Sequence, residues 1–420
     1  MKVDVVVVGG GPAGLSAAIE IGTRGGKVVV LDDHPTPGGK LLGQLHQEGN
    51  HSKWWKGFEL AQELKQKALA ANVQILSERQ VWGLEPGWKV HISDLVQNES
   101  GMEIQADCVL LATGAVEKPI PIPGWTLPGV LSIGAAQVMT NVYQVLPGKK
   151  VIVVGIDILS LSIARSMKLA GADVEGIYML PQSPFSNFAS PLLHLETLNE
   201  MTDFAPSKMI RLTGKLLKSK TGRKLAAQFY PPMGIKMWGI PIHLRHTILS
   251  INGNHEVDSA TITKVDVNGN PIGQQKDIQA DTICISGGLS PLYELAATAG
   301  CKFVTLEGLS GTVPLHNKEL ETTVPNLFVA GNITGIEGAK VAMAQGTLAG
   351  KSICNKLRIG NLKMADMEEA LSFVERSRKL SDIQFHPKVS EAREHLNDLW
   401  KTLIKDVSRE DKNGSNQKLY

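Results

Sequence analysis

Residues 5–14 read VVVVGGGPAG, and this stretch decides the fold. A run of four valines is typical of a strand buried in a parallel sheet, and the glycines lead it into residues that favour a helix. In such a strand, loop and helix, Gly9 permits the tight turn, Gly11 lets a ligand approach the backbone, and Gly14 lets helix and strand pack closely. The free N–H groups and the dipole at the helix start then favour a bound pyrophosphate.

The next apolar stretch supplies an acid at the expected distance. Residues 28–31 read VVVL and are followed by Asp32, 18 positions after Gly14. An acid about 20 residues beyond the glycines hydrogen-bonds the ribose 2′-OH of a bound dinucleotide. The sequence therefore predicts an adenosine dinucleotide site. Its expected contacts lie in the glycine loop and after the second strand: Gly9, Gly11, Pro12, Ala13, Gly14, Asp32 and Asp33.

Composition limits the class of protein. The chain has 420 residues, enough for two or three domains, and its 43 basic residues nearly balance 41 acidic ones. This balance favours neither nucleic acid nor an anionic membrane as a partner. No apolar run approaches the roughly 20 residues that span a bilayer, and the first strand begins too close to Met1 to leave room for a signal peptide. We therefore expect a cytoplasmic protein.

A second strand, loop and helix begins at residues 149–155, which read KKVIVVG. In the loop that follows, Asp157 and Ser160 stand where the second and third glycines of the pattern are expected. A carboxylate at the point of closest phosphate approach repels the ligand and occupies its space. The strand at residues 174–180 also ends without an acid or an arginine for a ribose or its phosphate. We predict that this second nucleotide site is disabled and that only its scaffold remains.

Three further segments resemble the two-dinucleotide-domain flavoproteins, the group that includes glutathione reductase and thioredoxin reductase. Residues 37–40 (PGGK) match the loop over the flavin, residues 110–115 (LLATGA) match the segment that closes the first nucleotide domain, and residues 323–332 (TVPNLFVAGN) match a late motif. The resemblance implies FAD as the cofactor. It adds these expected contacts: Gly39, Lys40, Ala112, Thr113, Gly114, Gly331 and Asn332.

Two of these positions affect how tightly a flavin would be held. The late motif usually ends in an aspartate that hydrogen-bonds the ribityl chain, and Asn332 replaces it with an amide that lacks charge-assisted strength. Lys40 can add positive charge near the flavin ring or face solvent. If residues 338–340 open a helix, the N–H groups at Ala339 and the helix dipole would face the flavin pyrimidine.

Within this superfamily, five stretches are similar to the alpha subunits of multi-subunit amine dehydrogenases. That group includes opine oxidase, hydrogen cyanide synthase, dye-linked proline and hydroxyproline dehydrogenases, and the alpha chain of heterotetrameric sarcosine oxidase. The similar stretches are residues 117–130, 134–137, 146–149, 287–295 and 331–339, and the likeness covers roughly residues 1–355.

This narrower resemblance implies an FAD-dependent oxidoreductase subunit that works with partners on CH–NH donors. A catalytic beta subunit with its own FAD would oxidise an amine or imino acid, and this chain would relay the electrons to an acceptor other than NAD. Residues 361–420 contain no cysteine, so an iron–sulfur cluster would have to come from another, small subunit. Such a complex would be free in the cytoplasm or attached to a membrane surface through partners.

We expect an α/β fold with two Rossmann-like dinucleotide-binding domains, the second inserted in the first, and a C-terminal helical tail. Residues 1–120 and 296–360 are expected to form the first domain and residues 121–295 the degenerate insert. Residues 361–420 are expected to form the tail, with its polar end from residue 408 disordered.

Other functions stay open or are excluded by missing residues. A disulfide reductase needs a dithiol beside the flavin, and residues 40–45 hold no cysteine. The four cysteines, Cys108, Cys284, Cys301 and Cys354, are scattered and are expected to be buried free thiols. A structural subunit that holds a non-redox adenine nucleotide such as ATP or NAD in the first site remains an alternative, as do FMN at a subunit interface and a stand-alone FAD-dependent oxidoreductase. No catalytic residue or metal site is nominated.

Overall fold

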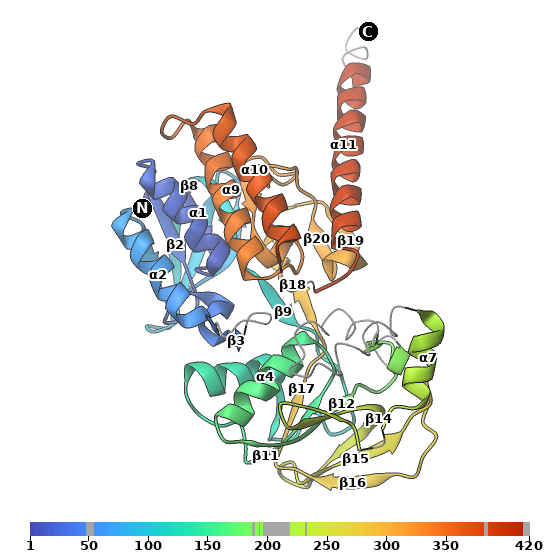
Figure 1. Ribbon diagram of the computed structural model, residues 1–420. Helices are drawn as coiled ribbons and strands as arrows, with labels where there is room; N and C mark the ends of the chain where they lie inside the picture. Colours follow the sequence, from blue (N-terminus) through green and yellow to red (C-terminus); the bar gives the residue numbers. More distant parts are fainter. Residues whose placement is uncertain are drawn as a thin grey trace. The chain divides into compact units, whose positions relative to one another are not determined.

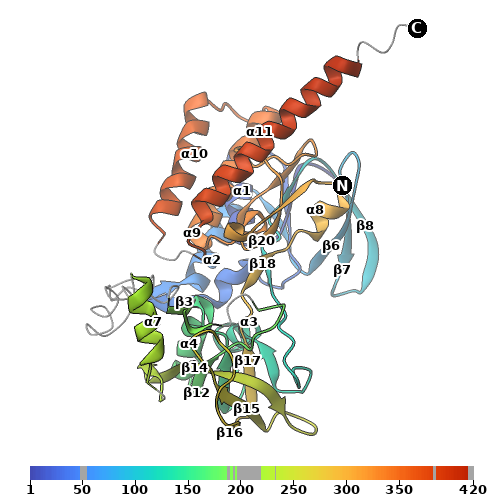
Figure 2. The same cartoon turned by 90° about the vertical axis from the view of Figure 1, so that its right-hand side faces the viewer.

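The computed structural model divides into two compact units. Unit 1 comprises Met1–Leu41, Phe58–Val116 and Leu289–Tyr420, and unit 2 comprises Leu42–Gly57 and Glu117–Gly288 (Figures 1 and 2). The structure describes residues 1–47, 54–186, 190–192, 194–195, 219–231, 233–381 and 385–414.

Unit 1 is built on a seven-stranded sheet in the order β5-β2-β1-β8-β7-β6, with β21 paired to β8. Strands β5, β2, β1, β8 and β21 are parallel, whereas β6, β7 and the first half of β8 form an antiparallel meander. The strand bounds are β1 (Lys2–Val8), β2 (Val28–Leu31), β5 (Gln74–Leu76), β6 (Arg79–Glu85), β7 (Lys89–Asp94), β8 (Glu99–Leu111) and β21 (Leu327–Val329). Two-stranded sheets pair β9 (Ala115–Glu117) with β18 (Leu289–Pro291), and β19 (Phe303–Leu306) with β20 (Gly311–Pro314).

The helices of this unit cover its sheet and extend the chain towards its C-terminus. They are α1 (Pro12–Thr23), α2 (Gly57–Ala70), α8 (Glu294–Thr298), α9 (Ala339–Leu357), α10 (Met364–Lys379) and α11 (Val389–Gly414), with short 3-10 turns η1 (Gly39–Gly43), η4 (Glu307–Leu309) and η5 (Gly331–Thr334). Helices α1 and α9 approach very closely, because a Cβ on Gly346 would lie 2.1 Å from the carbonyl oxygen of Ala13 and one on Gly350 would lie 2.7 Å from that of Ala17. Only glycine permits this packing.

Unit 2 holds a second sheet of eight strands in the order β10-β17-β11-β12-β14-β15-β16, with β13 paired to β14. The strands are β10 (Val130–Ser132), β11 (Lys150–Val154), β12 (Asp173–Met179), β13 (Ile235–Met237), β14 (Ile240–Asn252), β15 (Ser259–Lys264), β16 (Lys276–Gln279) and β17 (Thr282–Ile285). A separate antiparallel pair is formed by β3 (Leu45–Gln47) and β4 (Trp54–Lys56). Its described helices are α3 (Ile133–Gln137), the π-helix η2 (Val138–Val142), α4 (Ile158–Leu169) and α7 (Lys220–Gln228). The parallel strands β10, β17, β11 and β12 and the helix after β11 repeat the pattern of unit 1. The predicted α/β class with Rossmann-type units is confirmed.

Segment Leu42–Gly57 belongs to unit 2, although we expected it within a first domain of residues 1–120. The guanidinium carbon of Arg165 on α4 lies 4.9 Å from the ring centroid of Trp54 and 4.7 Å from that of Trp238. Both distances are those of cation–π contacts, and the contact with Trp54 ties the paired strands β3 and β4 to α4. Such a pairing depends on tertiary contact and leaves no mark in local sequence.

The C-terminal tail is helical, and α11 extends further than expected. Its backbone runs to Gly414, so it includes the first part of the stretch from residue 408 that we expected to be disordered, while residues 415–420 lie outside the described part. The first half of α11 is anchored because Leu396 packs with Leu309 and Val313 in a small core. An anchored helix extends at little cost per residue, which explains the longer run. No helix in the described ranges is both long and apolar enough to cross a bilayer.

Candidate functional site

The predicted site residues of unit 1 follow the carboxyl ends of four neighbouring parallel strands. Val8 at the end of β1 is in register with Leu31 of β2 and Leu111 of β8, and Leu111 is in register with Val329 of β21. Loops that follow these strands therefore start side by side. Ligands of open α/β sheets bind at this edge.

The three glycines of the first loop have different surroundings. Gly9 has a φ of +104°, and a Cβ on it would lie 2.4 Å from the carbonyl oxygen of Ala112. A Cβ on Gly14 would lie 1.9 Å from the carbonyl oxygen of Gly9. No described atom lies within 4 Å of a Cβ on Gly11. Gly9 and Gly14 are therefore required by the fold, whereas Gly11 leaves open space beside the backbone.

The start of α1 is not capped by a side chain. Gly11 is its N-cap residue, with extended backbone, and makes no side-chain hydrogen bond, while Pro12 occupies the first helical position. Proline is suited to this position because its missing N–H would have no helical partner. The remaining N–H groups and the positive end of the helix dipole face the space beside Gly11, which suits an anion.

Asp32 lies buried behind this loop, with 6% of its surface exposed. Its carboxylate accepts hydrogen bonds from the backbone N–H groups of Gly10 and of His34, the latter at 2.9 Å. Burial raises the pKa of Asp32, and these N–H donors oppose the rise. A carboxylate has lone pairs beyond these two bonds, so it can still accept one from a ribose hydroxyl. Asp33, the next residue, is exposed.

The loop around Gly38 and Gly39 lies against the glycine loop. The N–H of Gly38 donates to the carbonyl oxygen of Gly10 at 2.8 Å, and a Cβ on Gly39 would lie 3.1 Å from the Cα of Gly11. Gly39 has a φ of +54°, which favours glycine. Lys40 follows in η1 and is exposed.

The segment Ala112–Gly114 is tied to a distant part of the chain. Thr113 Oγ1 donates to the carbonyl oxygen of Leu292 at 2.6 Å, and the N–H of Leu292 donates to the carbonyl oxygen of Gly114 at 3.1 Å. Gly114 has a φ of +80°, and no described atom lies within 4 Å of a Cβ on it. The three residues thus turn the chain beside the glycine loop and leave space there.

The last expected contacts lie at η5 and the start of α9. Gly331 has a φ of +80°, and a Cβ on it would lie 2.8 Å from the Cβ of Ala13, so this turn is pressed against α1. Asn332 is half-buried in η5, and Ala339 is the first residue of α9. All fifteen predicted contacts therefore lie in unit 1, on loops and on the first residues of α1 and α9.

These residues fit the adenosine, pyrophosphate and ribityl parts of FAD. The open space at Gly11 is one that a Cβ would fill, and the uncapped helix beside it suits two phosphates. Asp32 is an acceptor for ribose, and the amide of Asn332 can both donate to and accept from hydroxyl groups.

Sequence reasoning missed a buried polar network behind Asn332. Gln345 on α9 accepts a hydrogen bond from the N–H of Gly331 at 2.7 Å and donates to Glu337 at 3.0 Å. Glu337 also pairs with Arg378 of α10 and Arg393 of α11. Glu337, in the stretch of residues 331–339, was the one available signal, but the arginines are far away in sequence.

The corresponding loop of unit 2 is closed by its own side chains. Asp157 is the N-cap of α4 and accepts a hydrogen bond from the N–H of Ser160 at 2.8 Å, while Ser160 Oγ accepts one from the N–H of Asp157 at 2.9 Å. Ser286 Oγ donates to the second carboxylate oxygen of Asp157 at 2.6 Å. Burial raises the pKa of Asp157. The carboxylate thus takes the place at the helix start that a phosphate takes in a working loop.

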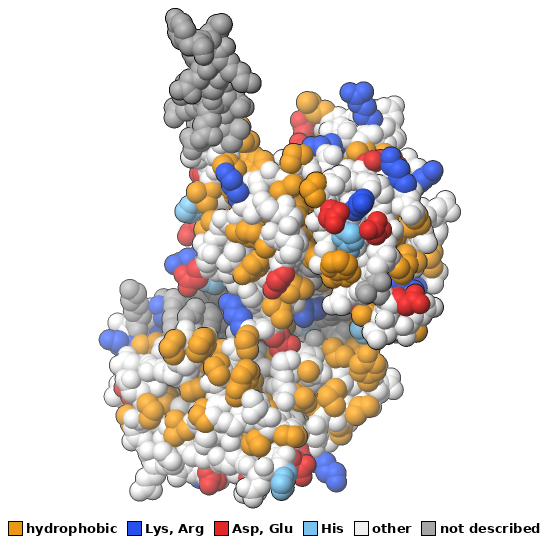
Figure 3. Space-filling model, turned by 180° about the vertical axis from the view of Figure 1, so that it is seen from behind, with side chains coloured by type: hydrophobic (Ala, Val, Ile, Leu, Met, Phe, Trp, Pro, Cys, Tyr) orange, Lys and Arg blue, Asp and Glu red, His pale blue; other side chains and the backbone are white. Residues whose placement is uncertain are grey.

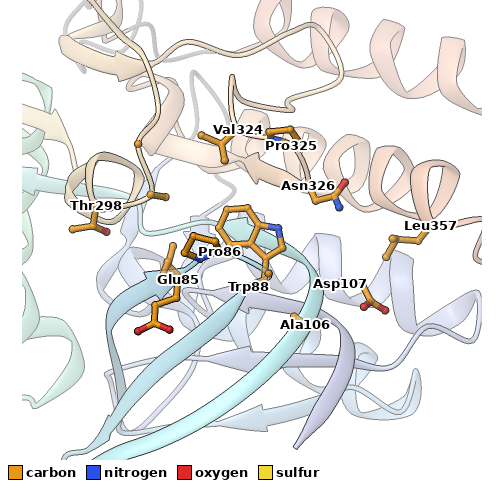
Figure 4. Close-up of a pocket in the computed structure, with 14 residues that line it drawn as sticks. Glu85, Pro86, Trp88, Ala106, Asp107, Thr298, Val324, Pro325, Asn326 and Leu357 are labelled. Carbon is orange, nitrogen blue, oxygen red and sulfur yellow. The ribbon is translucent and has the colours of Figure 1, made fainter.

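A separate hollow in unit 1 lies at the other end of the strands. It has a volume of about 640 Å³, and Figure 4 shows Pro86, Trp88, Val324 and Leu357 around it. Asn326, also in its lining, comes just before β21, whereas Gly331 comes after that strand. The hollow is therefore not the predicted site.

Other titratable groups offer no second reactive centre in the described ranges, where no cluster of three metal-ligating side chains is found. Burial raises the pKa of the Cys108 and Cys284 thiols to about 12, and all four cysteines are buried and free. Burial lowers the pKa of His316 to about 3, and its ring donates to the carbonyl oxygen of Pro314. Thiols and a histidine held in this way are uncharged near pH 7.

Known proteins are similar to this chain in sequence and in fold. An opine oxidase subunit of Agrobacterium tumefaciens (strain Ach5) is 28% identical over 85% of this chain and 66% of its own length. Hydrogen cyanide synthase subunit HcnB of Pseudomonas aeruginosa is 27% identical over 84% of this chain and 71% of its own length. The predicted resemblance to this group is confirmed. The chain spans about two thirds of the length of these relatives.

The fold is similar to that of a solved structure, and the sequence matches a described family. The structure of L-proline dehydrogenase from P. horikoshii matches with a TM-score of 0.61 at 19% identity, over 89% of this chain and 59% of that one. The family model described as pyridine nucleotide-disulphide oxidoreductase matches residues 3–346. The chain belongs to the pyridine nucleotide-disulphide oxidoreductase family.

Proposed function

We propose that the chain is the FAD-binding subunit of a hetero-oligomeric dehydrogenase that oxidises an amine or imino acid. One observation carries the proposal: the glycine loop of unit 1 leaves space at Gly11 and an uncapped helix, whereas Asp157 closes the loop of unit 2. One dinucleotide site is thus kept for a cofactor and the other is lost. Electrons therefore come from a partner or substrate and not from NADH.

The residues of unit 1 hold and orient the cofactor. The start of α1 and Gly11 receive the pyrophosphate, Asp32 accepts from the ribose, and Asn332 bonds the ribityl hydroxyls. The positive end of α9 at Ala339 favours negative charge on the pyrimidine side of the flavin, and Lys40 adds to this where its side chain turns inward. Bound FAD supplies the capacity to take up and release two electrons.

Membership of a larger complex is supported by the names of the relatives and by the exposed surface. Both curated relatives are named as subunits. Large apolar side chains are exposed in unit 2, among them Tyr143 at 58% and Val145 at 52%. Figure 3 shows many hydrophobic side chains on the visible face of unit 2, in the lower part of the picture. Contiguous exposed apolar surface marks interaction sites. The proposed partners are a catalytic beta subunit with its own FAD and a small iron–sulfur protein, in the cytoplasm or at a membrane surface.

The test begins with the purified chain and then its native complex. An absorbance spectrum and the identity of the nucleotide released on denaturation show which cofactor is present, and FAD is expected. Stopped-flow mixing with excess NADH should not bleach the flavin at tens per second, a typical turnover rate. Co-purification, followed by dye reduction with proline, hydroxyproline, sarcosine or opines, should recover activity only with partners. A chain that is monomeric and fully active on an amine by itself would refute the subunit role.

A second candidate function is a structural subunit that holds a non-redox adenine nucleotide, ATP or NAD, in the same site. Asn332 favours it, because the amide replaces the acid expected at the ribityl chain. Release of a nucleotide without flavin absorbance would support this candidate. FMN released from the complex and absent from the chain alone would instead place a flavin at a subunit interface.

A further inference from the structure

Glu337 is a carboxylate buried at the end of the cofactor loop, with 7% of its surface exposed. Arg378 Nε donates to one of its oxygens at 2.6 Å, and Arg393 Nη2 donates to the other at 2.5 Å. Burial alone would raise the pKa of Glu337, but Arg393 and Arg378 outweigh burial and lower it. The carboxylate is therefore held ionised between two cations.

The same network reaches the other end of the loop, the segment of residues 331–338. Gln345 Oε1 accepts hydrogen bonds from the N–H of Gly331 at 2.7 Å and from Thr334 Oγ1 at 3.1 Å. Arg393 Nη2 also donates to Thr334 Oγ1 at 3.0 Å. A continuous set of hydrogen bonds thus connects the turn that carries Asn332 to the segment before α9.

The backbone of this loop depends on such support. Gly335 has a φ of +132° and Gly338 a φ of +92°, both conformations that only glycine adopts readily. A Cβ on Gly335 would lie 3.1 Å from Arg393 Nη2, so the arginine is pressed against the loop backbone. Two glycines give the unfolded loop much freedom, and the network restricts it in the fold.

The two arginines come from outside the part of the chain that the family model matches. That match ends at residue 346, whereas Arg378 lies on α10 and Arg393 on α11. Helix α10 packs beside α9, as Figures 1 and 2 show, and α11 packs against η4. The C-terminal tail therefore inserts charged groups behind the late motif.

We propose that Arg378 and Arg393 are positioning residues of the cofactor site. Through Glu337 and Gln345 they hold residues 331–338 in the conformation that presents Asn332 and the start of α9 to the flavin. This inference rests on the proposed function, that unit 1 binds FAD. Docking of the two C-terminal helices and binding of the cofactor are then coupled, and the coupling acts in both directions.

The test compares Arg378 of α10 and Arg393 of α11 with a control arginine on α10. Arg378→Met removes a bond to Glu337, and Arg376→Met changes the same residue type two positions away on the exposed side of α10. Titration of the full-length apo chain with FAD should show affinity reduced about tenfold in Arg378→Met and in Arg393→Met, as for one buried charged hydrogen bond. Arg376→Met should stay within about twofold of the wild type.

Two readouts separate positioning from a general loss of stability. At saturating FAD, the circular dichroism of the bound flavin should change in Arg378→Met and not in Arg376→Met, and Arg393→Lys should recover part of the affinity that Arg393→Met loses. Variants that melt earlier but bind FAD with wild-type affinity and spectrum would overturn the inference.

Hydrogen exchange on the wild-type chain covers the case in which the arginine variants fail to fold. Addition of FAD should slow exchange in α10 and in the first half of α11. Unchanged exchange there, with FAD bound, would overturn the coupling and leave the proposed function intact. A wild-type chain that binds no FAD would overturn both.

Discussion

The loop after β1 in unit 1 and the loop after β11 in unit 2 have the same first turn but differ two residues later. Gly9 and Gly155 both follow a buried strand, have φ values of +104° and +109°, and press against the backbone of a neighbouring strand end, at Ala112 and Ser286. The backbone turn is therefore the same in units 1 and 2. The difference is at the next pattern position, where one loop has Gly11 and the other has Asp157.

That difference decides whether a side chain or a bound anion pairs with the free N–H groups at the start of the helix. In unit 2 the carboxylate of Asp157 caps α4 and is held by Ser160 and Ser286, so the helix is satisfied without a ligand. In unit 1 no side chain caps α1, and Gly11 leaves room. A capped helix contributes stability by itself, whereas an uncapped one leaves its N–H groups for an anion. A fold can thus exchange a ligand site for local stability through one residue.

The largest expected effect comes from filling the open space. Gly11→Leu should lower FAD affinity at least about 100-fold, which corresponds to about 2.7 kcal/mol, because the side chain occupies the place of the pyrophosphate. Gly11→Ala separates size from capping: alanine and leucine are similarly poor N-caps, and the single Cβ of alanine should lower the affinity less than leucine does. The measurement is flavin stoichiometry after gel filtration, with circular dichroism to show that both variants fold. Full stoichiometry in Gly11→Leu would mean that the cofactor binds elsewhere.

The next effect is on stability and not on the cofactor. Asp157→Ala removes the cap of α4 and leaves the hydroxyl of Ser286 without its acceptor, which should cost about 1–2 kcal/mol of unfolding free energy. Urea unfolding measures the cost, and Ser286→Ala in a double-mutant cycle separates the two contributions. FAD content should not change. A variant as stable as the wild type would show that the side chain of Asp157 does not stabilise α4.

How much of this was open to prediction from the sequence depends on distance along the chain. The loops of both units could be predicted because strand, glycine and helix are neighbours in sequence, and Asp157 stands out at a glycine position. The pairing of Glu337 with Arg378 and Arg393, 41 and 56 residues away, could not be predicted. The same holds for the stacking of Arg165 on Trp54, because no local pattern specifies which distant side chains meet.

A smaller effect is expected from the charge at position 332. Unit 2 has the acid Asp157 where a glycine is expected, and unit 1 has the uncharged amide of Asn332 where an acid is expected. Asn332→Asp should raise FAD affinity about fivefold, because hydrogen bonds to an ionised acceptor are roughly twice as strong as neutral ones. Asn332→Ala should lower it. Weaker binding in the aspartate variant, measured by fluorescence titration, would mean that this side chain does not face the ribityl hydroxyls.

The smallest effect is a pH dependence that tests the buried state of Asp157. Burial raises its pKa in the folded protein, so the stability it contributes is fully present below the ordinary value of 3.8 and is lost as pH rises through the folded pKa. An asparagine side chain cannot ionise, so Asp157→Asn should gain stability relative to the wild type between about pH 4 and pH 7. Urea unfolding at each pH measures the difference.

Asp266 of unit 2 provides a control of opposite sign for this measurement. Hydrogen bonds from the side chain and backbone of Asn270 lower the pKa of Asp266, so its contribution is present above the ordinary value of 3.8 and is lost as pH falls. Asp266→Asn should therefore lose stability relative to the wild type as pH rises towards 3.8, and this difference should then stay constant between about pH 4 and pH 7. If both variants show the same slope, the carboxylate of Asp157 is hydrated, and the start of α4 is more open than the comparison of the two loops requires.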